Sequence, residues 1–128
     1  MIVDSSAAIA ILLKQPDFET VFKKLAAADI AAMGAPTLAE TAIVLQAKLG
    51  FDSRGMLERF LQKFAISTIP FGEDHWHEAA DAYGRYGKGS HRASLNFGDC
   101  MSYAVARLAD QPLLCVGNDF PKTDLKIA

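Results

Sequence analysis

The sequence opens with Met1-Ile-Val-Asp4-Ser-Ser-Ala-Ala-Ile-Ala10, which combines a strand, an acid and a helix start within ten residues. The two residues before Asp4 are β-branched and apolar, as buried strand residues commonly are. Ser5 and Ser6 are helix-capping residue types, and an apolar run follows them. In open α/β sheets, ligands bind outside the carboxyl ends of the strands. We therefore expect Asp4 to lie at a ligand-binding edge of a sheet.

Strand and helix patterns alternate along the rest of the chain. Periodicity and capping signals, including a capping-box pattern at Thr37–Glu40, predict the later elements. Helices are expected at 5–14, 16–28, 37–49, 53–64, 73–86 and 96–109, and strands at 2–3, 30–33, 65–69 and 113–116, with a short edge strand in the tail. Strands separated by helices need crossover connections, which favours a mostly parallel sheet with helices on both faces. The predicted fold class is a three-layer α/β/α sandwich with four or five strands.

Composition indicates a single globular domain over residues 1–128, with 51% hydrophobic and 22% charged residues. Charged residues interrupt the apolar N-terminal third, so no membrane span is expected and we predict a cytoplasmic protein. A net charge of −2 argues against a surface that coats nucleic acid broadly, but it allows a local basic patch. Cys100 and Cys115 form no CxxC motif and are interpreted as buried free thiols.

Four acids are expected at one edge of this sheet, because the carboxyl ends of parallel strands lie together. They are Asp4, Glu40, Asp99 and Asp119. Each acid taken alone is also explained as a helix cap or a turn residue. Clustered carboxylates repel one another unless a cation neutralises them, and Mg²⁺ prefers such oxygen ligands. The cluster therefore points to metal-assisted hydrolysis of phosphodiester bonds.

Several blocks along the chain resemble the PIN-domain ribonucleases, and within them the VapC-type toxins of toxin–antitoxin pairs. The resemblance spans nearly the whole chain. Its most specific signal is the Leu-Asn-Phe-Gly-Asp-Cys block followed by the Gly-Asn-Asp-Phe block. The matching segments are 1–7, Ala35-Pro-Thr-Leu-Ala-Glu40, Leu95-Asn-Phe-Gly-Asp99-Cys-Met-Ser-Tyr-Ala-Val-Ala106, and Pro112-Leu-Leu-Cys-Val-Gly-Asn-Asp119-Phe with Thr123-Asp124.

This resemblance implies a metal-dependent endoribonuclease that binds Mg²⁺, or Mn²⁺, through its acids. It also implies a homodimer, an RNA substrate and inhibition by a cognate antitoxin protein. Asp4, Glu40 and Asp99 carry over as catalytic metal ligands, and Ser5 or Ser6 would supply the hydroxyl that orients the first carboxylate.

The fourth ligand is less determined than the first three. Many relatives have two adjacent acids where this chain has Asn118-Asp119. Asp119 is the predicted ligand, Asn118 is a weaker one and Asp124 lies further outside the motif. With one negative charge fewer at this position, we predict a single metal ion.

A basic loop immediately precedes the Asp99 helix. Lys88, His91 and Arg92 lie in it with no acid between them, and we predict that they bind the RNA backbone. A solvated surface loop is the alternative interpretation. Trp76 and Phe71 are expected to pack in the core.

The apolar stripes of helices 37–49 and 53–64 allow three interpretations, namely a groove for the antitoxin, a homodimer interface or plain core. Two other functions also remain open. One is a housekeeping PIN nuclease without an antitoxin, and the other is a non-catalytic PIN domain that binds RNA or protein. A phosphatase with its acid after the first strand ranks lower, because the chain lacks a second acid two residues on.

Overall fold

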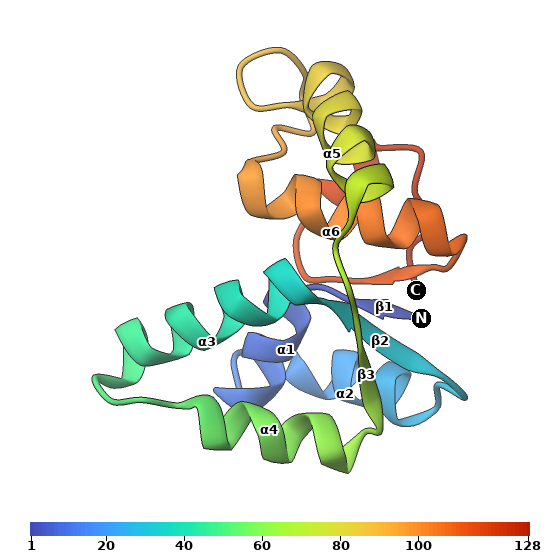
Figure 1. Cartoon of the computed structure of the whole chain (residues 1–128). Helices are drawn as coiled ribbons and strands as arrows, with labels where there is room; N and C mark the ends of the chain where they lie inside the picture. The colour runs from blue at the N-terminus through green and yellow to red at the C-terminus, as the bar shows by residue number, and fades with distance from the viewer.

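The computed structural model describes residues 1–128, and its centre is a sheet of four parallel strands. Helices cover both faces of the sheet (Figure 1). In spatial order the strands are β3 (Ile66–Ile69), β2 (Ala31–Gly34), β1 (Ile2–Val3) and β4 (Leu113–Leu114). This arrangement confirms the predicted α/β sandwich with a four-stranded parallel sheet.

The first four helices lie on one side of the sheet, and the last two lie on the other (Figure 1). Their bounds are α1 (Ser5–Leu12), α2 (Phe18–Ala26), α3 (Ala35–Leu49), α4 (Arg54–Lys63), α5 (Glu73–Tyr86) and α6 (Phe97–Ala109), followed by the short 3-10 helix η1 (Phe120–Lys122).

Alternation along the strands produces two separate cores. Val3 and Met33 point into the core beneath α1 to α4, whereas Ile2 and Ala32 point into the core beneath α5 and α6. Successive strand residues face opposite sides of a sheet, and both sides here are covered. The short strands therefore read as continuous apolar runs in the sequence.

The order of the strands places Asp4 at the switch point of the sheet. The chain proceeds from β1 to β2 and β3 in one direction, and β4 is added on the other side of β1. The backbone N–H of Asp4 donates to the carbonyl of Leu114 (2.9 Å), so the carboxyl ends of β1 and β4 stay together. Ligands bind at such reversal points in open parallel sheets.

Helix α3 begins at Ala35, so the prediction that Thr37–Glu40 forms its capping box was wrong. Gly34 is the N-cap, Pro36 occupies the first turn where its missing N–H is tolerated, and no side chain caps the helix. A Cβ at Gly34 would lie 2.7 Å from Val105 Cγ2, so the close approach of α6 requires glycine here. As a result Glu40 lies in the second turn of α3 rather than in its first.

Helix α2 begins two residues later than predicted. Asp17 adopts a left-handed conformation with φ of 65°, which Asp tolerates better than most residues. Pro16 therefore stays outside the helix. The predicted bounds of α5 and the end of α6 at Ala109 are confirmed.

The tail returns to the sheet beside β4. Leu113 pairs with Ile127 in an isolated parallel bridge, so the predicted edge strand is reduced to a single bridge. The tail also donates from the N–H of Ala128 to the carbonyl of Leu113 (2.9 Å). None of the helices is both long enough and apolar enough to cross a bilayer.

Candidate functional site

Asp4 is the most deeply buried of the four predicted site acids, with 3% of its surface exposed. It ends β1 and serves as the N-cap of α1. Its Oδ2 accepts hydrogen bonds from the backbone N–H (3.0 Å) and the hydroxyl (2.6 Å) of Ser6. Its Oδ1 accepts a hydrogen bond from the hydroxyl of Ser102 (2.5 Å). Three donors thus fix the orientation of this carboxylate.

Ser6, and not Ser5, provides the hydroxyl that orients Asp4. The Ser6 Oγ also accepts a hydrogen bond from the backbone N–H of Val116 (3.0 Å). Val116 begins the loop that carries Asp119, so one hydroxyl connects the first predicted acid to the loop of the fourth.

Asp99 lies in the first turn of α6, where it forms a capping box with Asn96. The Asp99 N–H donates to Asn96 Oδ1 (2.9 Å), and the Asn96 N–H donates to Asp99 Oδ2 (3.1 Å). Burial is the main reason that the pKa of Asp99 rises to about 6, and the Asn96 N–H opposes this rise. The negative charges of Asp4, Asp119 and Glu40 raise it further. Asp4, Glu40 and Asp119 therefore all lie within electrostatic reach of Asp99.

Glu40 reaches this edge from α3 and packs against the start of α6. A Cβ at Gly98 would lie 2.9 Å from Glu40 Cδ and would overlap its Oε2. A side chain at position 98 would therefore displace the Glu40 carboxylate from its present position. This role of Gly98 was not predicted from the sequence, although a glycine directly before Asp99 was the available signal.

Asp119 and Asn118 are both exposed in the loop after β4. Asp119 is the N-cap of η1, but its side chain makes no capping hydrogen bond. Its carboxylate is therefore the least constrained of the four.

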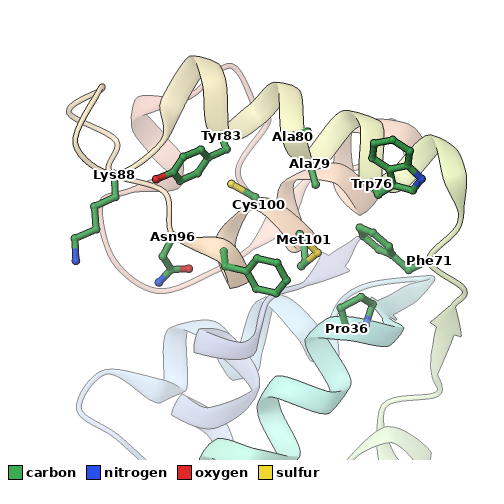
Figure 2. A pocket seen from close by; sticks show the side chains of 11 residues that line it. Pro36, Phe71, Trp76, Ala79, Ala80, Tyr83, Lys88, Asn96, Cys100 and Met101 are labelled. Atoms are coloured by element: carbon green, nitrogen blue, oxygen red, sulfur yellow. The ribbon is translucent and has the colours of Figure 1, made fainter.

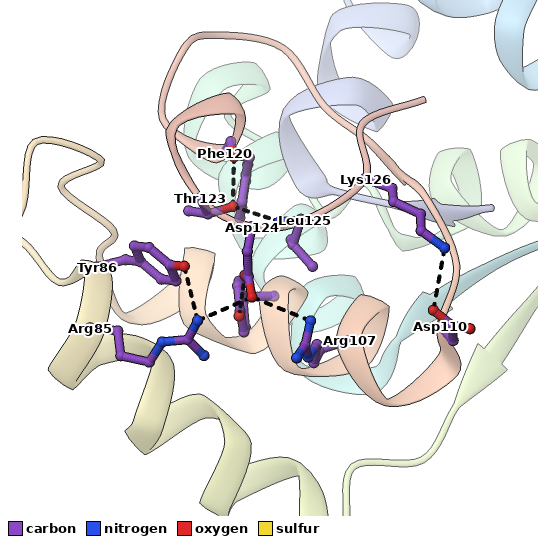
Figure 3. Close-up of polar contacts among 10 residues, drawn as sticks. Arg85, Tyr86, Arg107, Asp110, Phe120, Thr123, Asp124, Leu125 and Lys126 are labelled. Carbon is purple, nitrogen blue, oxygen red and sulfur yellow. Dashed lines mark hydrogen bonds and ion pairs between the residues drawn. The ribbon is translucent and has the colours of Figure 1, made fainter.

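The outside candidate Asp124 is engaged elsewhere, as Figure 3 shows. Its carboxylate accepts hydrogen bonds from Arg85 (3.0 Å), Tyr103 (2.6 Å) and Arg107 (3.3 Å). Arg107 lies eight residues after Asp99 on α6, a rise of about 12 Å along the helix axis. Asp124 therefore attaches the tail to α5 and α6, and we do not include it in the site.

The four acids have no basic counterpart. None of the ion pairs in the structure involves any of them. An uncompensated group of carboxylates favours a hard cation, and oxygen ligands of this kind suit Mg²⁺ or Mn²⁺. No three acids, histidines or cysteines are gathered closely enough to hold an ion by themselves. Mg²⁺ commonly uses only one or two carboxylates and completes its coordination with water and phosphate, so the donor set fits.

Backbone hydrogen bonds connect the two ends of the basic loop before α6. Gly87 and Leu95 form a parallel bridge, and the N–H of Lys88 donates to the carbonyl of Leu95 (2.9 Å). His91 is partly buried, and its Nδ1 accepts a hydrogen bond from the N–H of Ala93 (2.9 Å). Lys88 and Arg92 are exposed and form no ion pair. Of the three predicted RNA contacts, these two have free charges.

An apolar groove of about 810 Å³ lies beside the acids, between α5, α6 and the start of α3 (Figure 2). Trp76 and Tyr83 project from α5, Met101 from α6 and Pro36 from α3. Trp76 is 54% exposed, so the prediction that it packs in the core was wrong. Helix α5 packs on α6 through small residues such as Ala79, which leaves Trp76 and Tyr83 outside.

The apolar stripes of α3 and α4 pack largely in the core. Leu45, Leu57 and Phe60 belong to the core beneath α1 to α4, which favours the third of the three interpretations of these helices. The exposed apolar groove is on the opposite side of the sheet.

Known proteins match the chain over nearly its full length. A family model described as PIN domain matches residues 1–126. Ribonuclease VapC36 from Mycobacterium tuberculosis is 49% identical over 127 residues, covering 98% of this chain and 91% of that protein. Ribonuclease VapC from Mycolicibacterium smegmatis is 39% identical over 125 residues, covering 98% of this chain and 97% of that protein.

Solved structures share the fold at lower identity. The crystal structure of Mycobacterium tuberculosis VapC20, described as a sarcin-ricin loop cleaving toxin, has a TM-score of 0.80 and 17% identity, covering 99% of this chain and 97% of that one. A toxin–antitoxin complex from Klebsiella pneumoniae has a TM-score of 0.63 and 15% identity, covering 88% of this chain and 82% of that one.

Proposed function

The chain belongs to the PIN-domain family, and from this membership and its acidic edge we propose that it is the endoribonuclease toxin of a toxin–antitoxin pair. Relatives at 39% to 49% identity over nearly the full length are named VapC ribonucleases. The observation that carries the proposal is the group of four carboxylates around Asp99, which no basic residue neutralises.

Asp4, Glu40, Asp99 and Asp119 would surround the divalent cation, Mg²⁺ or Mn²⁺, with one or two of them bound directly and the others through its waters. Such a cation supplies Lewis-acid activation of the scissile phosphate and of the attacking water. Ser6 keeps Asp4 in place through two hydrogen bonds, and Gly98 leaves space for the Glu40 carboxylate. The protein itself thus orients the Asp4 carboxylate and leaves room for that of Glu40.

Lys88 and Arg92 would bind the phosphates that flank the cut. They lie in the loop that leads directly into the Asp99 helix, and no acid of the chain pairs with them. Contacts of this kind hold the backbone in register without reading the bases. His91 would have a smaller role, because its ring is already held by Ala93 and Tyr86.

Cleavage of cellular RNA by the purified protein tests this proposal. Cutting is expected with Mg²⁺ or Mn²⁺, and it should stop with a chelator and in Asp99→Asn. Asp81→Asn, which changes an exposed acid in the middle of α5, is the matched control and should cut normally. Metal-independent cutting, or full activity in Asp99→Asn, would refute the assignment. Absence of cutting by the folded protein would favour a domain that only binds RNA or protein.

The groove between α5 and α6 supports a homodimer as part of the proposal. A two-fold interface must be complementary to itself, so it needs both protruding and hollow parts on one patch. Trp76, Tyr83 and Phe97 protrude with 54%, 50% and 78% exposure, and Ala79 and Ala80 lie between them. Lys88 is the only charged residue that lines the groove. A second copy is therefore the proposed occupant.

Light scattering of Phe97→Glu tests the dimer. This change should give a protein of monomer mass at concentrations where the wild type is a dimer, because it would bury a charge in the interface. Ile43→Glu, on the exposed side of α3, is the control and should remain dimeric. A wild type that is already monomeric would remove the homodimer from the proposal.

The antitoxin is tested by expressing the chain in the cytoplasm of bacteria, where the proposed substrate RNA is found. The growth of the bacteria is the measurement. Expression of the chain alone should arrest growth. A toxin–antitoxin pair also requires a small protein encoded beside the chain, and its co-expression should restore growth. Arrest that persists would favour a nuclease without an antitoxin.

A further inference from the structure

Two buried hydroxyl groups form a chain behind Asp4. Ser102 Oγ lies 2.5 Å from Asp4 Oδ1 and 3.1 Å from Thr37 Oγ1. Ser102 and Thr37 are 1% and 2% exposed. No buried polar side-chain atom of the protein lacks a partner. A continuous polar connection therefore runs from α3 through α6 to the end of β1.

The direction of these hydrogen bonds follows from the donors available. An ionised Asp4 only accepts hydrogen bonds, so the single proton of the Ser102 hydroxyl points to Asp4. Thr37 must then donate to Ser102. Consecutive hydrogen bonds that point the same way polarise and strengthen one another. Both hydroxyl groups thus act on the carboxylate of Asp4.

The positions of the two hydroxyl groups match those of the acids on the same helices. Thr37 lies three residues before Glu40 on α3, and Ser102 lies three residues after Asp99 on α6. Residues three apart share one face of a helix. The contact between the hydroxyl groups therefore joins the two acid-bearing faces one turn away from each acid, and it ends on the third acid, Asp4.

We propose that Ser102, supported by Thr37, is a positioning residue of the metal site. It fixes the rotation of the Asp4 carboxylate and the separation of the helices that carry Glu40 and Asp99. Each carboxylate oxygen has about two acceptor positions. Ser6 fills both on Oδ2, whereas Ser102 fills one on Oδ1 and leaves the other for a cation. This inference rests on the proposed function.

The test measures binding of Mn²⁺ alone to the purified protein by titration calorimetry. Ser102→Ala should weaken Mn²⁺ binding about 10- to 100-fold, as loss of a group that orients a metal ligand does. Thr37→Val should cause a smaller loss of the same kind, and Thr37→Ser, which keeps the hydroxyl, should bind like the wild type. In RNA cleavage, the Mn²⁺ concentration for half-maximal rate should rise in parallel while the rate at saturating Mn²⁺ changes little.

Thr41→Val is the matched control. Thr41 is fully buried on the same helix, and its hydroxyl donates to the carbonyl of Thr37 (2.7 Å) instead of joining the connection to Asp4. It should bind Mn²⁺ like the wild type. Equal losses in Thr41→Val and Thr37→Val would mean that packing alone is responsible and would overturn the proposal.

Unchanged Mn²⁺ binding in folded Ser102→Ala, with binding lost in Asp99→Asn, would overturn only the positioning role. If Ser102→Ala does not fold, Thr37→Val decides the question, because it leaves every direct partner of Asp4 in place. A wild type that binds no Mn²⁺ would overturn both this inference and the proposed function.

Discussion

Replacing Asp99 by asparagine should stabilise the metal-free protein while it abolishes cleavage. Asp99 is partly buried near three other carboxylates, and these two causes raise its pKa to about 6 from an ordinary value of 3.8. The folded state therefore binds this proton more tightly than the unfolded state does. Stability contributed by the protonated acid is lost as the pH rises from about 4 to 6. The asparagine side chain would carry no charge at any pH.

The size of the effect follows from the pKa. A rise of the Asp99 pKa from 3.8 to about 6 corresponds to about 3 kcal/mol, since a shift of one pKa unit is worth about 1.4 kcal/mol. Solvent screening of a group that is not fully buried, and the weaker interaction of asparagine with the helix N-terminus, reduce this to about 1 to 2 kcal/mol. The gain should be full above pH 6 and should shrink toward pH 4.

Chemical denaturation of both proteins across pH 4 to 8, with chelator present, measures this difference. Asp81→Asn is the control and should show no comparable gain. Adding Mn²⁺ should then reverse the order, because a cation that binds only the folded wild type stabilises it by about 2.7 kcal/mol at 100 times its Kd. A variant that is less stable than the wild type at pH 8, or a difference that does not depend on pH, would refute the reasoning.

Four further substitutions examine other parts of the molecule. Gly98→Ala should reduce cleavage about 100-fold by displacing the Glu40 carboxylate. Gly84→Ala is the control, because Gly84 has open space around it. This variant should retain cleavage, and its free energy of unfolding should rise by about 0.5 to 1 kcal/mol in thermal unfolding. Lys88→Ala should lower the slope of log affinity for RNA against log salt concentration by about 1 in a filter-binding titration, and an unchanged slope would exclude a phosphate contact. Asp124→Ala should lower the free energy of unfolding by about 1 to 3 kcal/mol, because it leaves the hydroxyl of Tyr103 without its acceptor. Cleavage should persist in this variant.

The placement of the acids was predictable because parallel topology determines it. Once strands and helices alternate, every turn from strand to helix lies at the same edge of the sheet, whatever the details of packing. Asp4 follows from this rule alone, and Asp119 follows because β4 pairs directly with β1. Asp99 was placed at this edge by the same rule, although it does not follow a strand directly, and the motif shared with the PIN family is the stronger signal for it.

The supporting residues could not be predicted, because their roles depend on how closely two helices approach. Thr37 was interpreted as a helix cap, since the local pattern Thr-Leu-Ala-Glu is that of a capping box. Gly34 and Pro36 start the helix instead, which frees the threonine hydroxyl for Ser102. The prediction that Trp76 packs in the core was wrong for a related reason. Periodicity indicates that a helix has an apolar face, but it does not indicate how much of that face a neighbouring helix covers.

The four acids differ in how firmly the fold holds them, and this difference bears on the proposed metal site. Asp4 is buried with three donors, Asp99 is held in a capping box, and Asp119 is exposed in a loop without a capping bond. A ligand that is already fixed loses little conformational freedom when a cation binds, whereas a mobile one must first be ordered. Most of the affinity for the cation should therefore come from the buried side of the site, which carries Asp4. The exposed side can tolerate Asn118 in place of an acid, and it is also the side that RNA can approach to supply phosphate oxygens.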